Sequence, residues 1–371
     1  MRLEHRRNML AEAMDAQELW PTDSPWVRRA ILEDVPRHRF APDILWTWDG
    51  AAYVPVDRAL QPEAWADLVY AGPYDSAVTQ VGGGLPTSSL SCVSVVADML
   101  DSLILEPGHR TLEVGAGAGW NAALLAHRAG PGLVTSVEVD PDLAAAARQH
   151  IKAAGFDVEV QLGDGNAGWA QGAPYDRLIA TYAVETVPWS WIAQTRPGGR
   201  IVTPWGRLGH VALTVADDGQ SASGWVQGLG MFMPSRGVDQ GRELHAIQAD
   251  HPAGRTRRTE RDVRILGSNL GLLFGLRVWA PGIRFTTGRT EEGFTAWLHD
   301  GADSWATVTG GGPDGALVHE GGPRNLFEDV ESGWTHWQRH GAPGLYDFGM
   351  TVAPGRQTIW CMSPDGGPYA A

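Results

Sequence analysis

The chain has 371 residues, and its 29 Lys and Arg against 43 Asp and Glu leave a formal net charge of −14, which argues against a nucleic-acid partner because clustered cations bind phosphate backbones. No segment approaches the ~18 consecutive apolar residues of a membrane helix, and the charged N-terminal residues do not form a secretion signal. Cys92 and Cys361 are too distant in sequence to suggest a disulfide framework or a zinc site, so we expect a cytoplasmic protein without a metal or membrane partner.

Residues 1–80 are predicted to form an N-terminal segment of helices and loops that packs on the core. Within it, the segment SPWVRRAILEDVP predicts a helix that begins after the cap residue Ser24, has Pro25 in its first turn and ends before Pro36. The segment GGGLPTSSLSCVS follows at residues 82–94. Its glycines are expected to act as a hinge that lets a peptide-binding edge close.

The segment from about residue 90 to 215 alternates between short apolar stretches and helical patterns. Predicted helices are WNAALLAHRAG and PDLAAAARQHIKAAG, and predicted strands are RTLEVG, LVTSVEVD, VEVQLGD, YDRLIATYA and GGRIVTPWG. This order predicts an α/β domain over residues 81–240 with a mostly parallel, doubly wound sheet. The stretch that begins HVALTVADDG predicts a hairpin at the sheet edge.

The C-terminal third, residues 255–371, is predicted to form a separate α+β domain. The basic segment HPAGRTRRTERDV at 251–263 is expected to be a linker or a charged surface helix with a solvated face. Binding of an anionic or Asp-rich peptide is the functional alternative. EEGFTAWLHDGA and NLFEDVESGWTHWQRHG are predicted helices, whereas ALVHEG, FGMTVAP and RQTIWCMSP are predicted strands. His336 and His340 lack the sequence pattern of a metal site, and we expect them to lie on the surface.

The segment LEVGAGAGWNAALL places Gly115, Gly117 and Gly119 between a buried strand and a helix. Glycines there let the backbone approach a ligand closely, and the helix N-terminus offers unpaired N–H donors. A dinucleotide fingerprint requires a small residue where this chain has Trp120, which disfavours that ligand. After the next two strands come Glu138, whose carboxylate can accept from both ribose hydroxyls, and Asp164; either one alone would equally fit a solvated turn.

The G-x-G-x-G spacing resembles the loop of S-adenosylmethionine-dependent methyltransferases. Further segments resemble, in order, the motifs of the protein-L-isoaspartate O-methyltransferase family: DVPRHRFAPD at 34–43, TLEVGAGAGWNAALLA, VTSVEVDPDLA, LGDGNAGW, APYDRLIATYA and PGGRIVTPWG. The resemblance covers residues 24–235. It implies a Rossmann-like class I S-adenosylmethionine methyltransferase fold, to which the C-terminal α+β domain is added.

The resemblance also implies a cofactor and residues that bind it. The cofactor is S-adenosyl-L-methionine. The residues expected to bind it are Glu113, Gly115, Ala116, Gly117, Gly119, Trp120, Asn121, Glu138, Val139, Asp164, Gly165 and Thr181.

Ser91 stands where the family has its active-site hydroxyl, and we expect it to steady the acceptor carboxylate. Ser88, Ser89 and Thr87 are further candidates. The family usually continues with Gln-Pro or Ala-Pro after this serine, whereas this chain has Cys92-Val93. No covalent nucleophile is expected, because no His or Asp partner is specified and methyl transfer does not require one.

More than 130 residues follow residue 235, where the family's repair enzymes usually end. This extension and the altered run before Ser91 resemble a diverged branch that modifies ribosomally made peptides such as graspetides, lanthipeptides or lasso peptides. The resemblance implies a monomer that esterifies an aspartyl carboxylate in a precursor peptide and leaves an aspartimide, with the C-terminal domain recognising the peptide. The alternatives are isoaspartate repair of damaged proteins, a non-catalytic regulator that binds the cofactor, and a small-molecule methyltransferase.

Overall fold

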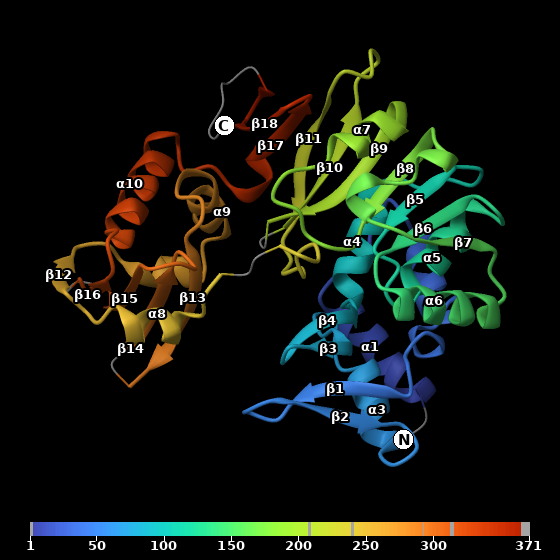
Figure 1. The fold of residues 1–371 in the computed structure, drawn as a ribbon, viewed down its shortest axis with the longest axis horizontal. Coiled ribbons are helices and arrows are strands. Elements are labelled where there is room, and N and C mark those ends of the chain that lie inside the picture. Colours follow the sequence, from blue (N-terminus) through green and yellow to red (C-terminus); the bar gives the residue numbers. More distant parts are fainter. Residues whose placement is uncertain (1–2, 207–208, 239–240, 292, 312–314, 365–371) are drawn as a thin grey trace. The chain divides into compact units, whose positions relative to one another are not determined.

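The chain divides into two compact units (Figure 1). A computed structural model describes residues 3–206, 209–238, 241–291, 293–311 and 315–364. The first unit consists of residues 1–235 and 351–357, and the second of residues 236–350 and 358–371. The first unit therefore includes both the N-terminal segment and the methyltransferase-like domain expected from the sequence, and the second begins before the expected boundary at residue 255.

A mixed nine-stranded sheet, with strands β5 to β11 in the first unit and β17 and β18 divided between the two units, confirms the α/β prediction. Its strand order is β18-β17-β11-β10-β9-β8-β5-β6-β7. Strands β5 to β9 pair in parallel, whereas β9, β10 and β11 pair antiparallel and form the expected hairpin. The strands are β5 (Thr111–Val114), β6 (Val134–Glu138), β7 (Val158–Leu162), β8 (Tyr175–Ala180), β9 (Thr195–Trp205), β10 (Gly209–Val215), β11 (Ala222–Gly228), β17 (Phe348–Ala353) and β18 (Arg356–Cys361).

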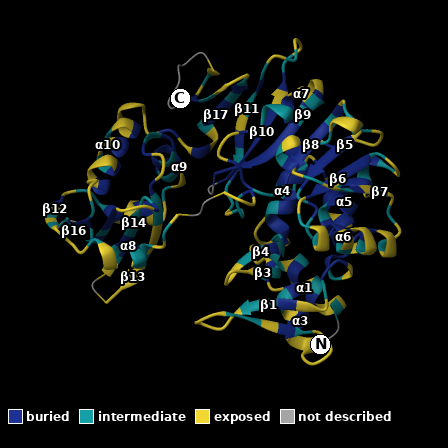
Figure 2. Cartoon of the chain, viewed as in Figure 1, coloured by how far each residue is buried: buried dark blue, intermediate teal, exposed yellow. Residues whose placement is uncertain are grey.

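The parallel strands place four loops at one edge of the sheet. Every residue of β5 and β6 is buried, and Figure 2 shows the central strands as the buried core of the unit. Because the carboxyl ends of parallel strands meet at the same edge, the loops after β5, β6, β7 and β8 lie near one another. This topology positions the candidate site.

Helices of the first unit pack on this sheet and on the N-terminal segment. They are α1 (Leu3–Ala16), α2 (Trp26–Arg29), α3 (Pro62–Val69), α4 (Val93–Leu103), α5 (Trp120–Ala129), α6 (Pro141–Ala154) and α7 (Trp189–Gln194). In α6 the Asp140 side chain accepts from two first-turn N–H groups, and Gly155 ends the helix in the left-handed conformation. The predicted bounds of this helix are thereby confirmed.

The N-terminal segment also contains strands, so the expectation of helices and loops alone over residues 1–80 is wrong. A small antiparallel sheet has the order β2-β1-β3-β4, formed by β1 (Ile44–Trp48), β2 (Tyr53–Asp57), β3 (Ala77–Gly82) and β4 (Leu85–Leu90). Gly83 and Gly84 have φ of +58° and +82° and form the turn between β3 and β4. Two consecutive positive φ angles suit a tight hairpin turn, so these glycines are a β-turn and not the expected hinge.

The second unit contains a five-stranded antiparallel sheet and its own core. The strand order is β12-β16-β15-β14-β13. Leu272 and Leu276 of one helix and Phe327 and Val330 of another pack with apolar residues of the sheet. The elements are α8 (Leu244–Asp250), β12 (Arg255–Thr259), α9 (Leu270–Trp279), β13 (Arg284–Thr290), β14 (Gly293–His299), β15 (Trp305–Gly310), β16 (Ala316–Gly321) and α10 (Leu326–Arg339).

Two predictions in this unit are wrong. The segment 251–263 is neither a linker nor a helix, because Arg255–Thr259 forms edge strand β12. The segment 291–302 contains strand β14, in which Ala296 and Leu298 face the core and alternate with Trp297. The helix and the strands predicted at α10, β16, β17 and β18 are confirmed.

Candidate active site

The glycine loop after β5 is held in a conformation that only glycine adopts easily. Gly115, Gly117 and Gly119 have φ of +95°, +52° and +87°. A Cβ on Gly115 would lie 2.3 Å from the Thr181 hydroxyl oxygen, and that hydroxyl donates to the Gly115 carbonyl at 2.6 Å. The loop therefore needs glycine for its backbone angles and, at Gly115, for the close approach of the β8 end.

Glu138 ties the loops after β5 and β6 together. Its side chain is 6% exposed, and its Oε2 accepts from the Gly117 N–H at 2.9 Å. Its Oε1 accepts from the N–H groups of Val139 and Asp140 at 3.0 and 3.1 Å. The neighbouring Val139 side chain is nearly half exposed and offers an apolar surface beside the carboxylate. A carboxylate acceptor and an exposed apolar side chain therefore lie next to each other where strand β6 ends.

Tyr182 joins the remaining loops and was missed by the sequence interpretation. A Cβ on Gly165 would lie 2.5 Å from the Tyr182 hydroxyl, and one on Gly115 would lie 3.0 Å from its ring. Burial raises the pKa of Tyr182, and the nearby carboxylates of Asp164 and Glu138 raise it further. The structure thus brings Gly115, Asp164 and Gly165 around one phenol. Its place in the sequence could have indicated this role, because Tyr182 directly follows Thr181 just after strand β8.

Trp120 was expected to bind the cofactor, but its side chain points elsewhere. The indole is 3% exposed, and its Nε1 donates to the Val35 carbonyl at 2.9 Å. Arg37 lies over the ring, with its guanidinium carbon 5.4 Å from the ring centroid. The indole therefore packs on the N-terminal VPRHRF segment, and only the backbone at the start of α5 remains directed to the glycine loop.

Glu113 and Asn121 were also expected at the cofactor, but their side chains bind each other beneath the loop. Glu113 is fully buried, and its Oε1 accepts from the Asn121 amide at 2.8 Å while Oε2 accepts from the Ser136 hydroxyl. Burial raises the pKa of the Glu113 carboxyl to about 7, although the hydrogen bonds from Ser136 and Asn121 oppose this rise. This pair supports the loop from below.

The raised pKa of Glu113 predicts a pH-dependent stability. The carboxyl binds a proton more tightly in the folded chain than in the unfolded chain. Its contribution to the free energy of unfolding is therefore complete below the usual pKa of 4.5 and is lost as the pH rises to about 7. Glu113→Gln, an uncharged isostere, is expected to gain about 2–3 kcal/mol relative to the wild type between pH 5 and 8. Urea unfolding across this range measures the difference, and parallel profiles would contradict the assignment. The two proteins must be compared with each other, because buried His210, whose pKa is lowered to about 4, makes the stability of both rise with pH.

The hydroxyl cluster at residues 87–91 lies along hairpin strand β4 and just after it. Ser88 is 5% exposed, accepts from the Thr79 hydroxyl at 3.0 Å, and lies 3.6 Å from a Cβ placed on Gly117. Ser89 is its neighbour in strand β4 and is partly exposed. Thr87 donates to the Gln80 side chain at 2.8 Å, and Gln80 donates to Asp140 at 3.1 Å. The hairpin thus reaches the loops after β5 and β6.

Ser91 follows strand β4 and precedes helix α4. It is partly exposed, and its hydroxyl makes no hydrogen bond with any residue that the structure describes. Helix α4 still begins at Val93, the position where the resembled family has proline, and Cys92 caps it in an extended conformation. Proline suits the first position of a helix but is not required there, so its absence leaves the local fold intact.

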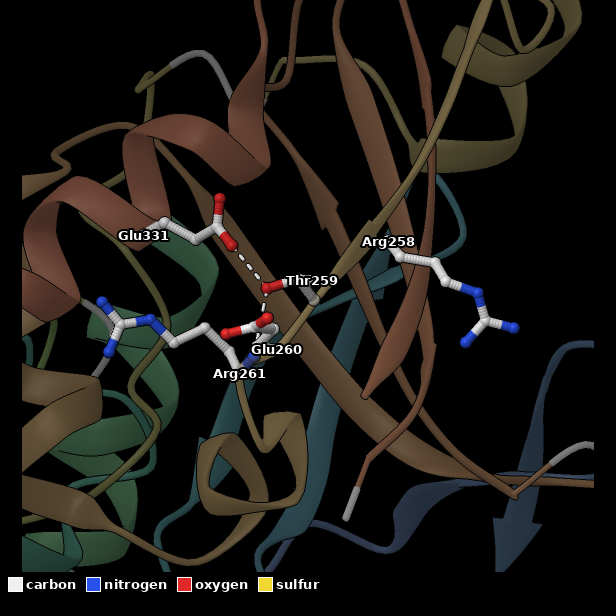
Figure 3. A pocket seen from close by; sticks show the side chains of 5 residues that line it. All are labelled: Arg258, Thr259, Glu260, Arg261 and Glu331. Atoms are coloured by element: carbon white, nitrogen blue, oxygen red, sulfur yellow. Dashed lines mark hydrogen bonds between the residues drawn. The ribbon is translucent and has the colours of Figure 1, made fainter. Parts of the chain in front are cut away.

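A pocket of about 500 Å³ lies in the second unit, at the edge of the five-stranded sheet. Its lining residues are Arg258, Thr259, Glu260, Arg261 and Glu331. Figure 3 shows Thr259 and Glu331 joined by a hydrogen bond, with the exposed Arg258 side chain directed away from them. The pocket contains none of the residues expected at the cofactor loop.

Within the described ranges, no group of three or more His, Cys, Asp and Glu side chains is arranged to hold a metal ion. Of the helices that the structure describes, none is long and apolar enough to cross a membrane.

The residues at the sheet edge fit a nucleoside cofactor with a small charged tail. The glycine loop provides a close backbone approach that a Cβ on Gly115 would block, and α5 begins beside it. Glu138 and the exposed Val139 supply a hydroxyl acceptor and an apolar surface. This donor set suits S-adenosyl-L-methionine better than a dinucleotide, because buried Trp120 occupies the position that a dinucleotide fold reserves for a small residue.

Comparisons with known proteins agree with this geometry. The family model described as Protein-L-isoaspartate(D-aspartate) O-methyltransferase (PCMT) matches residues 22–232. The chain is 37% identical over 183 residues to the protein-L-isoaspartate O-methyltransferase of Methanopyrus kandleri, covering 48% of this chain and 69% of that protein. It is 35% identical over 243 residues to protein-L-isoaspartate O-methyltransferase 2 of Archaeoglobus fulgidus, covering 64% and 95% of the two chains.

Two solved structures are also similar. One named protein-L-isoaspartate O-methyltransferase is 21% identical with a TM-score of 0.49, covering 96% of this chain and all of that chain. A structure described as the Plasmodium falciparum protein-L-isoaspartate O-methyltransferase in complex with S-adenosyl-L-homocysteine is 14% identical with a TM-score of 0.44. The match covers 62% of this chain and 98% of the Plasmodium falciparum chain.

Proposed function

Because the chain belongs to the protein-L-isoaspartate(D-aspartate) O-methyltransferase family, we propose that it esterifies the side-chain carboxylate of an aspartyl residue in a peptide. It is an S-adenosyl-L-methionine-dependent carboxyl O-methyltransferase whose substrates are proteins or peptides. The observation that carries the proposal is the position of the hydroxyl-bearing hairpin, with Ser88 beside the glycine loop at Gly117.

The chain's own residues have modest chemical tasks. When bound, S-adenosyl-L-methionine supplies an electrophilic methyl group to an oxygen nucleophile. A carboxylate is already ionised at neutral pH, so the chain needs no strong general base. It needs to hold the acceptor oxygen about 3 Å from the methyl carbon and in line with the departing sulfur. Ser91, with a hydroxyl not engaged elsewhere in the described chain, is assigned to hold the second carboxylate oxygen.

We assign the cofactor-facing role to a subset of the expected residues. Glu138 is proposed to accept from the ribose hydroxyls, with Val139 against the base and Asp164 near its amino group. The backbone of Gly115, Ala116, Gly117 and Gly119 forms the cradle, and Thr181 supports it through the carbonyl of Gly115. Glu113, Trp120 and Asn121 are proposed to act as supports, because their side chains are occupied within the protein.

The finer proposal concerns the substrate, which we place in a ribosomally made precursor peptide, whether linear or macrocyclic. The chain would methylate a normal Asp, and the next backbone amide nitrogen would then attack the ester carbonyl, release methanol and leave an aspartimide. Two observations support this choice. The second unit begins at Arg236, beyond the residues that match the family model, and Cys92-Val93 replaces the usual residues after the acceptor serine.

We propose that the second unit recognises the peptide. Strand β12 lies at the edge of its sheet, and a sheet edge can add an extended peptide through backbone hydrogen bonds. Arg258 is exposed beside the pocket on this edge, which favours a peptide with acidic residues (Figure 3). We further propose that the protein is a cytoplasmic monomer.

The second candidate is repair of isoaspartyl residues in damaged proteins. Two observations favour it: the curated relatives carry that enzyme name, and the VPRHRF segment makes buried contacts with both the cofactor helix and the hairpin. A regulator that binds the cofactor without turnover is a weaker alternative, because hydroxyl groups are retained beside the cofactor loop.

One assay separates these candidates. The full chain and S-adenosyl-L-methionine are incubated separately with an isoaspartyl peptide, its normal-Asp counterpart and a precursor peptide encoded beside the gene, and masses are followed. We expect a methyl group to be gained and methanol then lost on the precursor alone. Turnover of isoaspartyl peptides alone would replace this proposal with the repair function. Cofactor binding without methylation of any peptide would favour the regulator. Arg258→Ala is expected to raise KM only for the precursor.

A further inference from the structure

Arg37 lies in the interior of the first unit although its side chain is charged. It belongs to the VPRHRF segment and is 1% exposed. Burial lowers the pKa of its guanidinium to about 10, so the group remains charged at neutral pH. Burying a charge is costly unless polar groups compensate it, so the partners of this side chain need a physical explanation.

The guanidinium joins two elements that are distant in sequence. Its Nη1 donates to the carbonyl of Val69, the last residue of helix α3, at 3.0 Å. Its Nη2 donates to the carbonyl of Leu90, the last residue of strand β4, at 2.6 Å. The end of α3 carries a partial negative charge that favours a cation. The shorter of the two bonds is the one made to the hairpin.

The Leu90 carbonyl belongs to the peptide plane that leads into Ser91. Because a peptide unit is planar, anchoring this oxygen also fixes the nitrogen and Cα of the next residue. The position of the Ser91 hydroxyl then depends on only two rotations, about the N–Cα and the Cα–Cβ bonds of Ser91. A hydrogen bond to the Leu90 carbonyl therefore limits where the Ser91 hydroxyl can lie.

The same segment is attached to the cofactor helix. The guanidinium carbon of Arg37 lies 5.4 Å from the centroid of the Trp120 ring, and the Trp120 indole donates to the Val35 carbonyl at 2.9 Å. Trp120 is the first residue of α5, directly after the glycine loop. Residues 35–37 thus contact the start of the cofactor helix and the residue before the acceptor hydroxyl.

We propose that Arg37 is a positioning residue for methyl transfer: it holds the Leu90–Ser91 peptide in register with the start of α5, so that the acceptor carboxylate meets the methyl group in line. This inference rests on the proposed function, because it assigns Ser91 to the acceptor side. Arg37 acts through Ser91 and does not touch the reacting atoms. The Arg37 Nε is buried without a hydrogen-bond partner in the described chain, which indicates that the two carbonyl contacts determine the placement of the side chain.

The test is a double-mutant cycle with Arg37→Lys, Ser91→Ala and the combined variant. Lysine keeps the charge but cannot donate from a rigid planar fork to two carbonyls. We expect Arg37→Lys to lower kcat about 10–100-fold, because small misplacements of reacting groups are costly. The Kd for S-adenosyl-L-methionine should change less than about 3-fold. In the Ser91→Ala background, Arg37→Lys should have little further effect, since the group it positions is absent.

Two further variants provide controls. Arg39→Lys changes an arginine of the same segment whose side chain is exposed and donates to the Ala153 carbonyl, and it is expected to leave kcat unchanged. Trp120→Phe keeps a ring beneath Arg37 but removes the bond to Val35, and it is expected to lower kcat by a smaller factor than Arg37→Lys. Thermal unfolding of each variant identifies general loss of structure.

The outcomes distinguish the inference from the proposed function. Independent, multiplicative effects of Arg37→Lys and Ser91→Ala on kcat would overturn the positioning role, as would an unchanged kcat in Arg37→Lys. If the Arg37→Lys protein does not fold, the inference is tested by the kcat of Trp120→Phe. A reduced kcat in that variant would support the inference, and an unchanged kcat would overturn it. A wild-type chain that methylates no aspartyl or isoaspartyl peptide would instead refute the proposed function.

Discussion

Glu138→Ala is expected to weaken binding of S-adenosyl-L-methionine about 100-fold or more. The carboxylate accepts from the backbone N–H groups of Gly117, Val139 and Asp140, so its removal leaves three donors unpaired and frees the glycine loop. Each lost charge-assisted hydrogen bond costs roughly 1.5–3 kcal/mol, and the proposed ribose acceptor disappears as well. Isothermal titration calorimetry with S-adenosyl-L-homocysteine measures the change directly.

Two companion variants sharpen this prediction. Glu138→Gln keeps the length of the side chain and one acceptor oxygen, so we expect a loss of affinity smaller than that of alanine, about 10-fold. Glu159→Ala changes an exposed glutamate on neighbouring strand β7 and should bind the ligand as the wild type does. Wild-type affinity in a folded Glu138→Ala protein would remove this residue from the proposed cofactor site.

Gly115→Ala is expected to destabilise the chain by about 3 kcal/mol and to reduce cofactor affinity. The φ of +95° is unfavourable for alanine by roughly 1–2 kcal/mol, and the added Cβ would lie 2.3 Å from the Thr181 hydroxyl oxygen. Overpacking of this kind typically adds about 1–3 kcal/mol. Urea unfolding gives the stability change, and calorimetry gives the affinity of the folded fraction.

Gly155→Ala is the matched control that measures the cost of the positive φ angle alone. Gly155 has a φ of +85°, but no atom lies within 4 Å of a Cβ placed on it, so this variant should lose only the strain of about 1 kcal/mol. Adding Thr181→Ala to Gly115→Ala removes the overlapping hydroxyl and should recover part of the difference. Equal losses in Gly115→Ala and Gly155→Ala would show that the close approach of Thr181 does not matter.

The central sheet and the glycine loop were predictable because local sequence signals carry them. The strands at β5 to β9 are short apolar runs separated by capped helices, and burial on both faces makes such runs conspicuous. Pro141 and Gly155 predicted the bounds of α6 for the same local reason. The parallel order of the strands brings Glu138 to Gly117, whereas the hairpin that brings Ser88 there was not expected.

The strands at the ends of the chain were harder to predict because their signals are weak. Strand β12 has the sequence RTRRT, in which every residue is arginine or threonine and no apolar residue marks the buried face. Its half-buried arginines find polar partners outside the strand: Arg257 pairs with Glu331 of helix α10 at 2.7 Å, and Arg255 donates to the carbonyls of Gly322 and Arg324. Strand β14 begins at Gly293, and its buried residues Ala296 and Leu298 form too short a pattern to exclude a helix. In both cases distant partners decide the structure.

The sequence by itself determined the α/β core, the family and the cofactor loop, because strand periodicity, caps and glycine positions act over a few residues. Only the tertiary structure decided where the side chains around that loop point. Glu113 and Trp120 stand beside the glycines in sequence, yet Glu113 accepts from Ser136 and Trp120 donates to Val35 across the fold. Asn121 donates to Glu113. Arg37 reaches Leu90, 53 residues away, through a contact that no local pattern encodes. Buried polar groups form hydrogen bonds with whichever partner the fold brings close to them, and the neighbouring residues in the sequence do not identify that partner.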